Sequence, residues 1–159
     1  MYITFEEYTA LYGSVEESDF NRISYDACRH IDRLTTGIDG VKKLKTAFPT
    51  DEDAAEAVKR CIAAVINFLI QLDALEKTAS SVRGYNETAN GLQGKVVSSV
   101  AAGNESISFS SGDMNTLADV SAADISTRNQ AISNIVYEFL SGVADANGVN
   151  LLYMGQYPL

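Results

Sequence analysis

The chain has few of the residues on which enzymes and metal sites usually depend. It contains one histidine, His30, two cysteines and no tryptophan. No Cys–His spacing in it suits a zinc ion. The segment Gly91-Leu92-Gln93-Gly94 precedes a predicted strand, whereas a phosphate-binding loop joins a strand to a helix. A Cys–His dyad would require the fold to bring His30 next to Cys61. We therefore predict a protein that is not an enzyme, with no catalytic residue, metal or cofactor.

Long apolar runs and positive charge are also scarce. No apolar run reaches the length of about 18 residues that suggests a membrane-spanning helix. The segment Met1–Glu7 lacks the basic region of a signal peptide, which favours synthesis in the cytosol. The net charge is −9, so we expect no binding of nucleic acid through the overall field of the protein. The densest basic stretch, Lys42–Lys45, is predicted to be a solvated turn and not a phosphate site.

The acidic clusters have a structural explanation. Glu6-Glu7, Glu16-Glu17 and Asp51–Asp53 each lie at the start of a predicted helix. Carboxylates in a first helical turn stabilise the helix through its dipole. Helix capping therefore explains these clusters more simply than metal binding or acid–base catalysis.

The two cysteines, Cys28 and Cys61, both fall inside predicted helices. Cysteine is among the residues that are most often buried, so we interpret both as small core residues. A disulfide between two helices stays an alternative, although a cytosolic protein rarely needs one.

The first two predicted helices have clear boundary signals. Thr4 and Glu7 have the spacing of a capping box, and Gly13 is a natural helix stop. Ser18 or Asp19 is expected to cap the second helix, which runs to about residue 34. Its apolar residues recur every three or four positions and predict one buried stripe: Phe20, Ile23, Ala27, Ile31 and Leu34.

Two further helices complete the predicted body, after a loop at residues 37–50. The first of them opens at Thr50 and runs to about Lys77 as the central core helix. Its wide apolar face consists of Ala54, Val58, Cys61, Ile62, Val65, Phe68, Leu69, Leu72 and Leu75. The last helix is expected to start near Ser121 or Asp124 and to end before Gly148. Its predicted stripe is Ile125, Ile132, Ile135, Val136, Phe139, Leu140 and Val143.

Residues 78–120 form a polar insertion between the helices, rich in Ser, Thr, Asn and Gly. Within it, Lys95–Ala102 and Glu105–Ser111 alternate like strands around Gly103-Asn104, a favourable two-residue hairpin turn. The predicted register pairs Val100 with Ile107, Ser98 with Phe109 and Val96 with Ser111. It places Val96, Val100, Ile107 and Phe109 on one face, and Val97 on the other. An isolated hairpin is marginally stable, so we expect it to pack on the helices or on another copy.

The last segment, residues 148–159, is unusually apolar for a chain end, which is normally polar and frayed. Its large apolar and aromatic residues are Leu151, Leu152, Tyr153, Met154 and Tyr157. They predict an extended, strand-like tail that docks on another subunit. The alternative is that the tail folds back and covers the core of its own chain.

Together these patterns predict a mainly α fold: a small bundle of about four helices with an inserted β-hairpin and an extended C-terminal tail. We expect one domain over residues 1–159. The helical body comprises residues 1–77 and 121–147, the insertion residues 78–120, and the tail residues 148–159.

The order of these parts resembles a known family. The features that carry the resemblance are Tyr2-Ile3-Thr4-Phe5-Glu6-Glu7-Tyr8, Tyr12-Gly13, Ile31-Asp32-Arg33-Leu34-Thr35, the long core helix, the Ser-rich hairpin around Val97–Phe109 and Leu151-Leu152-Tyr153-Met154-Gly155. This arrangement looks like that of the head–tail connector proteins, also called adaptor or head-completion proteins, of long-tailed double-stranded-DNA bacteriophages. The resemblance covers nearly the whole chain. In these proteins the position of Met154 tends to be basic, so the chain departs from the pattern there.

The resemblance implies a structural protein of the virion neck, made in the bacterial cytoplasm. It implies a ring of about a dozen copies that lies beneath the portal and continues the DNA channel toward the tail. The portal-binding residues would be Leu151, Leu152, Tyr153, Met154 and Tyr157. Contacts with neighbouring subunits, or with a stopper or tail-completion protein, would come from Val96, Val97, Val100, Ile107 and Phe109. An acidic channel would let DNA pass without specific binding.

A second interpretation stays open. The chain could be a small cytosolic helical module for protein–protein interaction, or a ring component of another virion or of a secretion assembly. Neither interpretation involves a membrane.

Overall fold

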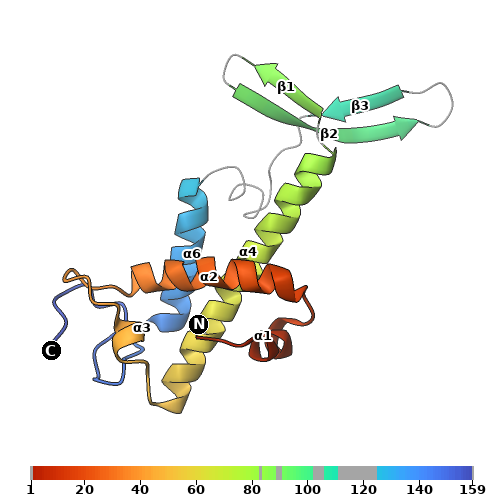
Figure 1. The fold of residues 1–159 in the computed structure, drawn as a ribbon. Helices are drawn as coiled ribbons and strands as arrows, with labels where there is room; N and C mark the ends of the chain where they lie inside the picture. Colours follow the sequence, from red (N-terminus) through yellow and green to blue (C-terminus); the bar gives the residue numbers. More distant parts are fainter. Residues whose placement is uncertain (1, 83, 89–90, 102–105, 111–124, 159) are drawn as a thin grey trace.

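The structure, a computed structural model, is mainly helical, as predicted (Figure 1). It describes the backbone of residues 2–82, 84–88, 91–101, 106–110 and 125–158, and the side chains of residues 2–75 and 125–158. The helices are α1 (Phe5–Tyr12), α2 (Glu17–Leu34), α3 (Lys43–Thr46), α4 (Glu52–Val82) and α6 (Ile125–Leu140). The strands are β1 (Gly84–Thr88), β2 (Gly91–Ala101) and β3 (Ser106–Ser110).

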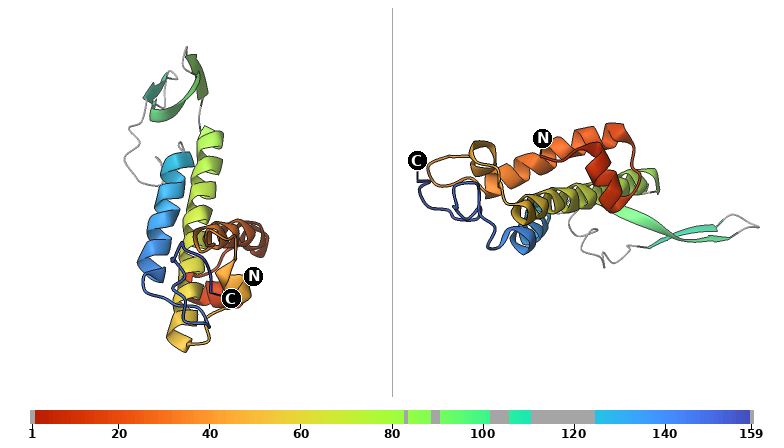
Figure 2. Two further views of the ribbon diagram at one scale, coloured as in Figure 1. Left: turned by 90° about the vertical axis from the view of Figure 1, so that its left-hand side faces the viewer. Right: turned by 90° about the horizontal axis from the view of Figure 1, so that it is seen from below.

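Helix α4 is the centre of the fold. Figures 1 and 2 show α6 alongside it, running in the opposite direction, and α2 crossing it on another side. The centre of the apolar face predicted from the sequence is buried here: Val58, Cys61, Ile62 and Val65 are fully inaccessible to solvent, and Ile66, which was not predicted, is buried with them. The first turn is capped by Asp51 and not by Thr50, because the Asp51 carboxylate accepts a hydrogen bond from the Ala54 N–H at 3.0 Å.

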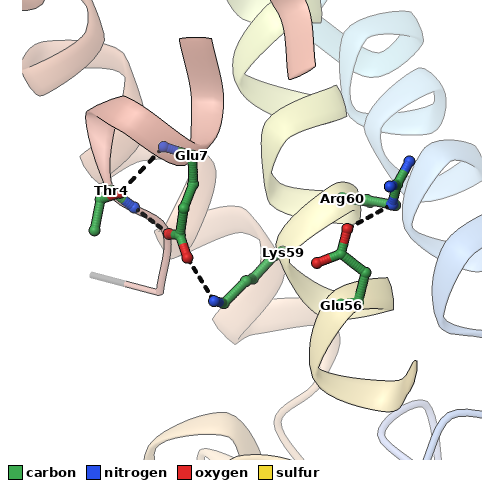
Figure 3. Close-up of polar contacts among 5 residues, drawn as sticks. All are labelled: Thr4, Glu7, Glu56, Lys59 and Arg60. Atoms are coloured by element: carbon green, nitrogen blue, oxygen red, sulfur yellow. Dashed lines mark hydrogen bonds and ion pairs between the residues drawn. The ribbon is translucent and has the colours of Figure 1, made fainter. Parts of the chain in front are cut away.

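Helix α1 begins with the capping box that the sequence predicts (Figure 3). The Thr4 N–H donates to the Glu7 carboxylate at 2.7 Å, and the Glu7 N–H donates to the Thr4 hydroxyl at 3.2 Å. The same carboxylate accepts a hydrogen bond from Lys59 Nζ of α4 at 2.5 Å. One side chain therefore both caps α1 and ties it to the central helix. Gly13 ends the helix with a positive φ of 87°, as expected.

Helix α2 starts one residue before the predicted caps, with Glu16 at the N-cap position and no capping side chain. The Ser18 or Asp19 cap was therefore wrong. Asp19 instead pairs with Arg22 one turn later, and Arg22 also reaches Asp73 of α4 at 2.8 Å. The predicted stripe is confirmed, with Phe20, Ile23, Ala27 and Ile31 buried and Leu34 partly buried.

Helix α6 is shorter than predicted, because it ends at Leu140 and not near residue 147. Gly142, with φ of 82°, reverses the chain, and residues 143–151 form a compact loop. Ile132, Val136 and Leu140 are buried as expected, but Ile125 is 73% exposed. The predicted start at residues 121–124 lies outside the described residues.

The described part of the insertion contains three antiparallel strands, where the sequence predicted two, in the order β1-β2-β3. Strand β1 pairs with the first half of β2, from Gly84 opposite Lys95 to Thr88 opposite Gly91. The sequence did not reveal β1, because Gly, Asn and Glu have low β propensity. Figure 1 shows the sheet beyond the C-terminal end of α4, away from α1 and α2.

The predicted hairpin exists as β2 and β3, with a different register at one end. Val100 lies opposite Ile107, as predicted. Phe109, however, lies opposite Val97 and not Ser98, because the register shifts between Val97 and Ser99. Such a bulge places two residues of one strand against one of the other. It also brings Val96 opposite Ser110 in place of Ser111. The Gly103-Asn104 turn and the predicted faces of the hairpin side chains lie outside what the structure describes.

Candidate functional site

The C-terminal segment is folded back on the body and is not an extended arm. Leu151 is fully buried and Tyr157 is 3% exposed, and Leu152 packs against the same core cluster. The prediction that these three residues dock on another subunit is therefore corrected. They cover the core of their own chain, which was the alternative. Tyr153 and Met154 differ from them, being 53% and 56% exposed.

Lys43 holds the tail from the opposite side. The predicted loop at residues 37–50 contains the short helix α3, whose first residue is Lys43. Its side chain is fully buried, and its ammonium donates to the carbonyl of Leu151 at 3.0 Å and to that of Tyr153. Burial lowers the pKa of Lys43, while the carboxylates of Asp145 and Asp39 act in the opposite direction. The prediction of a solvated basic turn was therefore wrong for Lys43, although Lys42 and Lys45 are exposed.

Asp145 is the second attachment point and is 6% exposed. One carboxylate oxygen accepts hydrogen bonds from the Asn147 and Val149 N–H groups, both at 2.9 Å. The other oxygen accepts the Tyr157 hydroxyl at 2.6 Å. This hydrogen bond is the main cause that raises the pKa of Tyr157. A single carboxylate thus closes the loop after α6 and holds the end of the tail.

Asp39 makes the third attachment. Its carboxylate accepts the Tyr157 N–H at 2.6 Å and the Val41 N–H at 3.1 Å, and these bonds lower the pKa of Asp39. The Ile38 N–H also donates to the Met154 carbonyl at 3.2 Å. We call the three side chains Lys43, Asp145 and Asp39 the tail clasp. Lys43 and Asp39 lie 108 and 118 residues from tail groups that they bind, so no local pattern could have revealed the clasp.

The clasp leaves three large apolar side chains exposed where the tail meets the loop after α2. These are Ile38, at 83% exposure, with Tyr153 and Met154. We call them the apolar corner. Tyr153 and Met154 were predicted as partner-binding residues, whereas Ile38 was not, because in the sequence it is an isolated apolar residue in a loop.

We expect Gly37→Ala to loosen the clasp. A Cβ at Gly37 would lie 2.8 Å from the Gly155 carbonyl oxygen and 2.9 Å from the Asp39 carboxylate. Overpacking of this kind costs about 1–2 kcal/mol of folding stability. Chemical denaturation should show this loss. Gly40→Ala is not a suitable control, because the positive φ at Gly40 would itself make alanine unfavourable. The control is Ala146→Ser, at an exposed site, which should leave the midpoint unchanged. An unchanged midpoint for Gly37→Ala would contradict the tight approach of loop and tail.

A surface groove of about 870 Å³ lies along α2 and is also lined by Tyr2, Lys42 and Lys45. The only histidine, His30, lines it and has a pKa lowered by burial and by Arg33. Cys28 lines it too, and burial raises the pKa of its thiol. Cys61 lies in the core instead, where burial raises its pKa to about 12. Both cysteines are free thiols, so they do not form the alternative disulfide.

The described residues contain neither a metal-binding cluster nor a membrane-spanning helix. No group of three or more His, Cys, Asp or Glu side chains there could hold a metal ion. None of the helices, over the residues described, is long and apolar enough to cross a membrane. Comparison of the chain with protein-family models, curated proteins and solved structures finds no match.

Proposed function

We propose that the chain is a structural subunit of a bacteriophage neck, forming a ring that connects the portal of the head to the tail. The observation that carries this proposal is the apolar corner. Exposed apolar side chains that gather in one place mark interaction sites on soluble proteins. Here they are also held in a defined position, because the backbone of Tyr153 is bonded to Lys43 and that of Met154 to Ile38.

In this proposal the portal contact is made by a smaller set of residues than the sequence predicted. Tyr153 and Met154, with Ile38, would meet the portal directly. Leu151, Leu152 and Tyr157 would support them from the core side, since they pack inside the chain. A contact surface that is already ordered loses less conformational entropy on binding than a disordered arm.

The sheet is the second surface that supports the proposal. It lies at the far end of α4, away from the loop and tail that form the apolar corner (Figure 1). In the ring, β2 and β3 would contact a neighbouring subunit or a stopper or tail-completion protein. Two different surfaces at different ends would let one subunit contact the portal at one end and a further neck component at the other. The net charge of −9 suits a channel through which DNA passes without being held.

The test of the portal contact is the double variant Tyr153→Ala/Met154→Ala. Loss of buried interface anchors typically weakens binding by a factor of roughly 10–100, and we expect that loss for binding to the cognate portal ring. Thermal unfolding should change only slightly: both side chains are about half exposed, and the contact of the Tyr153 ring with Lys43 Nζ, 5.8 Å from the ring centroid, is worth about 0.5–1 kcal/mol. Tyr137→Ala is the matched control, because Tyr137 is 57% exposed on α6, outside the corner.

Light scattering, on the chain alone and mixed with the portal, separates the proposal from the second interpretation. A mass that rises to that of a portal-bound ring supports the connector. A chain that stays monomeric and inert with the portal and with the other neck proteins contradicts it. That outcome would favour a small interaction module or a component of another assembly. Tight binding of duplex DNA by the assembled ring at moderate salt would contradict free passage of DNA.

A further inference from the structure

The groove along α2 concentrates the positive charge of an acidic protein. The chain has 12 lysines and arginines, and four of them line this groove: Arg29, Arg33, Lys42 and Lys45. They face two acids in the lining, Asp26 and Asp32. Arg29, Arg33 and Asp26 are exposed on successive turns of α2, and Lys42 and Lys45 come from the α3 region. A cationic groove of this kind suits an acidic partner.

The groove has cations left over after its internal pairs are formed. Asp32 is already used, because it accepts the Tyr2 hydroxyl at 2.6 Å and pairs with Lys45 at 3.2 Å. Arg29 and Lys42 form no ion pair with any described residue. The lowered pKa of His30, which arises from burial and then from Arg33, agrees with a positive local potential.

The first turn of α4 carries the opposite charge in excess. Asp51, Glu52 and Asp53 are consecutive and exposed. Asp51 caps its own helix, but Glu52 and Asp53 make no ion pair within the described part of the chain. Their carboxylates therefore remain available on the surface.

We propose that the α2 groove binds the first turn of α4 from a second copy of this chain. The contact joins two different surfaces of the chain, the groove of one copy and the acidic turn of the next. A pair of copies therefore keeps one free groove and one free acidic turn, so further copies can add until a ring closes. The charges are complementary, which favours correct orientation and fast association. Asp26 and the overall charge of −9 oppose a nucleic-acid backbone in the same groove. The inference deepens the proposed ring and rests on it for its biological setting.

Charge reversal tests the contact in the full-length chain. Sedimentation velocity at low salt and millimolar protein should show association for the native sequence. Arg29→Glu/Arg33→Glu and Glu52→Lys/Asp53→Lys should each weaken it by roughly tenfold or more, the effect expected from unfavourable charge juxtaposition. Mixing the two variants should restore association, because each supplies the surface that complements the other. Melting curves will show whether the double change disturbs folding. If it does, the single variant Lys42→Glu tests the groove with a smaller change of charge.

Glu16→Lys/Glu17→Lys is the matched control, since it reverses two exposed acids elsewhere on the surface. It should leave association unchanged, and a loss there would overturn the assignment to α4. A native chain that stays monomeric under these conditions would also overturn it, as would variants that associate normally. Binding of a short DNA duplex that is lost in Arg29→Glu/Arg33→Glu would assign the groove to phosphate instead.

The portal experiment is independent of this test. If the native chain self-associates through the groove but ignores the portal, the connector proposal fails and the copy-to-copy contact stands. If the charge-reversed variants still form complete portal-bound rings, the contact proposed here fails and the connector proposal stands.

Discussion

Leu151→Ala should lower the free energy of unfolding by about 2–5 kcal/mol, the usual cost of truncating a buried leucine to alanine. Leu151 is fully inaccessible to solvent and belongs to the cluster formed by α2, α4 and α6. Its removal leaves a cavity that the surrounding helices fill only in part. The melting temperature should fall by roughly 5–15 °C, and thermal unfolding followed by circular dichroism would measure this.

Met154→Ala is the control for this prediction, three positions away in the same tail. Its side chain is 56% exposed, so the stability change should stay within about 0.5 kcal/mol. Deletion of residues 151–159 should destabilise the body at least as much as Leu151→Ala. Equal stability of the native, Leu151→Ala and truncated chains would show that the tail is a separate docking arm after all.

Lys43→Met should lower the free energy of unfolding by about 2–4 kcal/mol, because it removes the donor from the buried carbonyl of Leu151 and from the partly buried carbonyl of Tyr153. Methionine has a similar length and apolar stem, so the loss reports mainly on the ammonium group. The tail should open more often, and limited proteolysis should cut it faster near Tyr153. Denaturation in urea gives the stability, and mass spectrometry of the fragments locates the cleavage.

Lys42→Met is the matched control, at the neighbouring position and with an exposed side chain. It removes the same charge from the same turn but should change neither stability nor proteolysis. A similar loss in both variants would mean that net charge, and not the bonds of Lys43 to the tail, is responsible. A Lys43→Met protein as stable as the native chain would contradict the clasp.

The clasp limits which tail residues could contact a partner during assembly. The three clasp side chains hold the tail with polar contacts, while Leu151 and Tyr157 hold it with apolar burial. Among the described residues at that end, the large apolar side chains that remain exposed for a partner are Ile38, Tyr153 and Met154. The portal contact proposed here is therefore a small, ordered surface, and the remaining interface area of a ring must come from elsewhere, such as the α2 groove.

Several parts of the fold could be predicted from the sequence because they depend on neighbouring residues. The capping box at Thr4 and Glu7 joins residues three positions apart. The stripes of α2 and α4 follow from helical periodicity, and their burial is confirmed. The centre of the hairpin, Val100 opposite Ile107, follows from the alternation of two adjacent segments.

The errors in the hairpin and in α6 have local causes that the sequence pattern does not show. A bulge between Val97 and Ser99 displaces Phe109 by one position, although the residues on each side alternate regularly. Val143 continues the apolar spacing of α6, but Gly142 has already turned the chain. In both places the periodic pattern continues through a change in backbone direction.

The helical body, the strands β2 and β3 and the apolar character of the tail could be predicted from the sequence, because these depend on residues close together along the chain. The placement of the tail, in contrast, follows from contacts between distant residues. Lys43 lies 108 and 110 residues from its two carbonyl partners, and Asp39 lies 118 residues from Tyr157. Whether Leu151 faces a partner or its own core depends on those distant contacts, since the apolar driving force is the same for both.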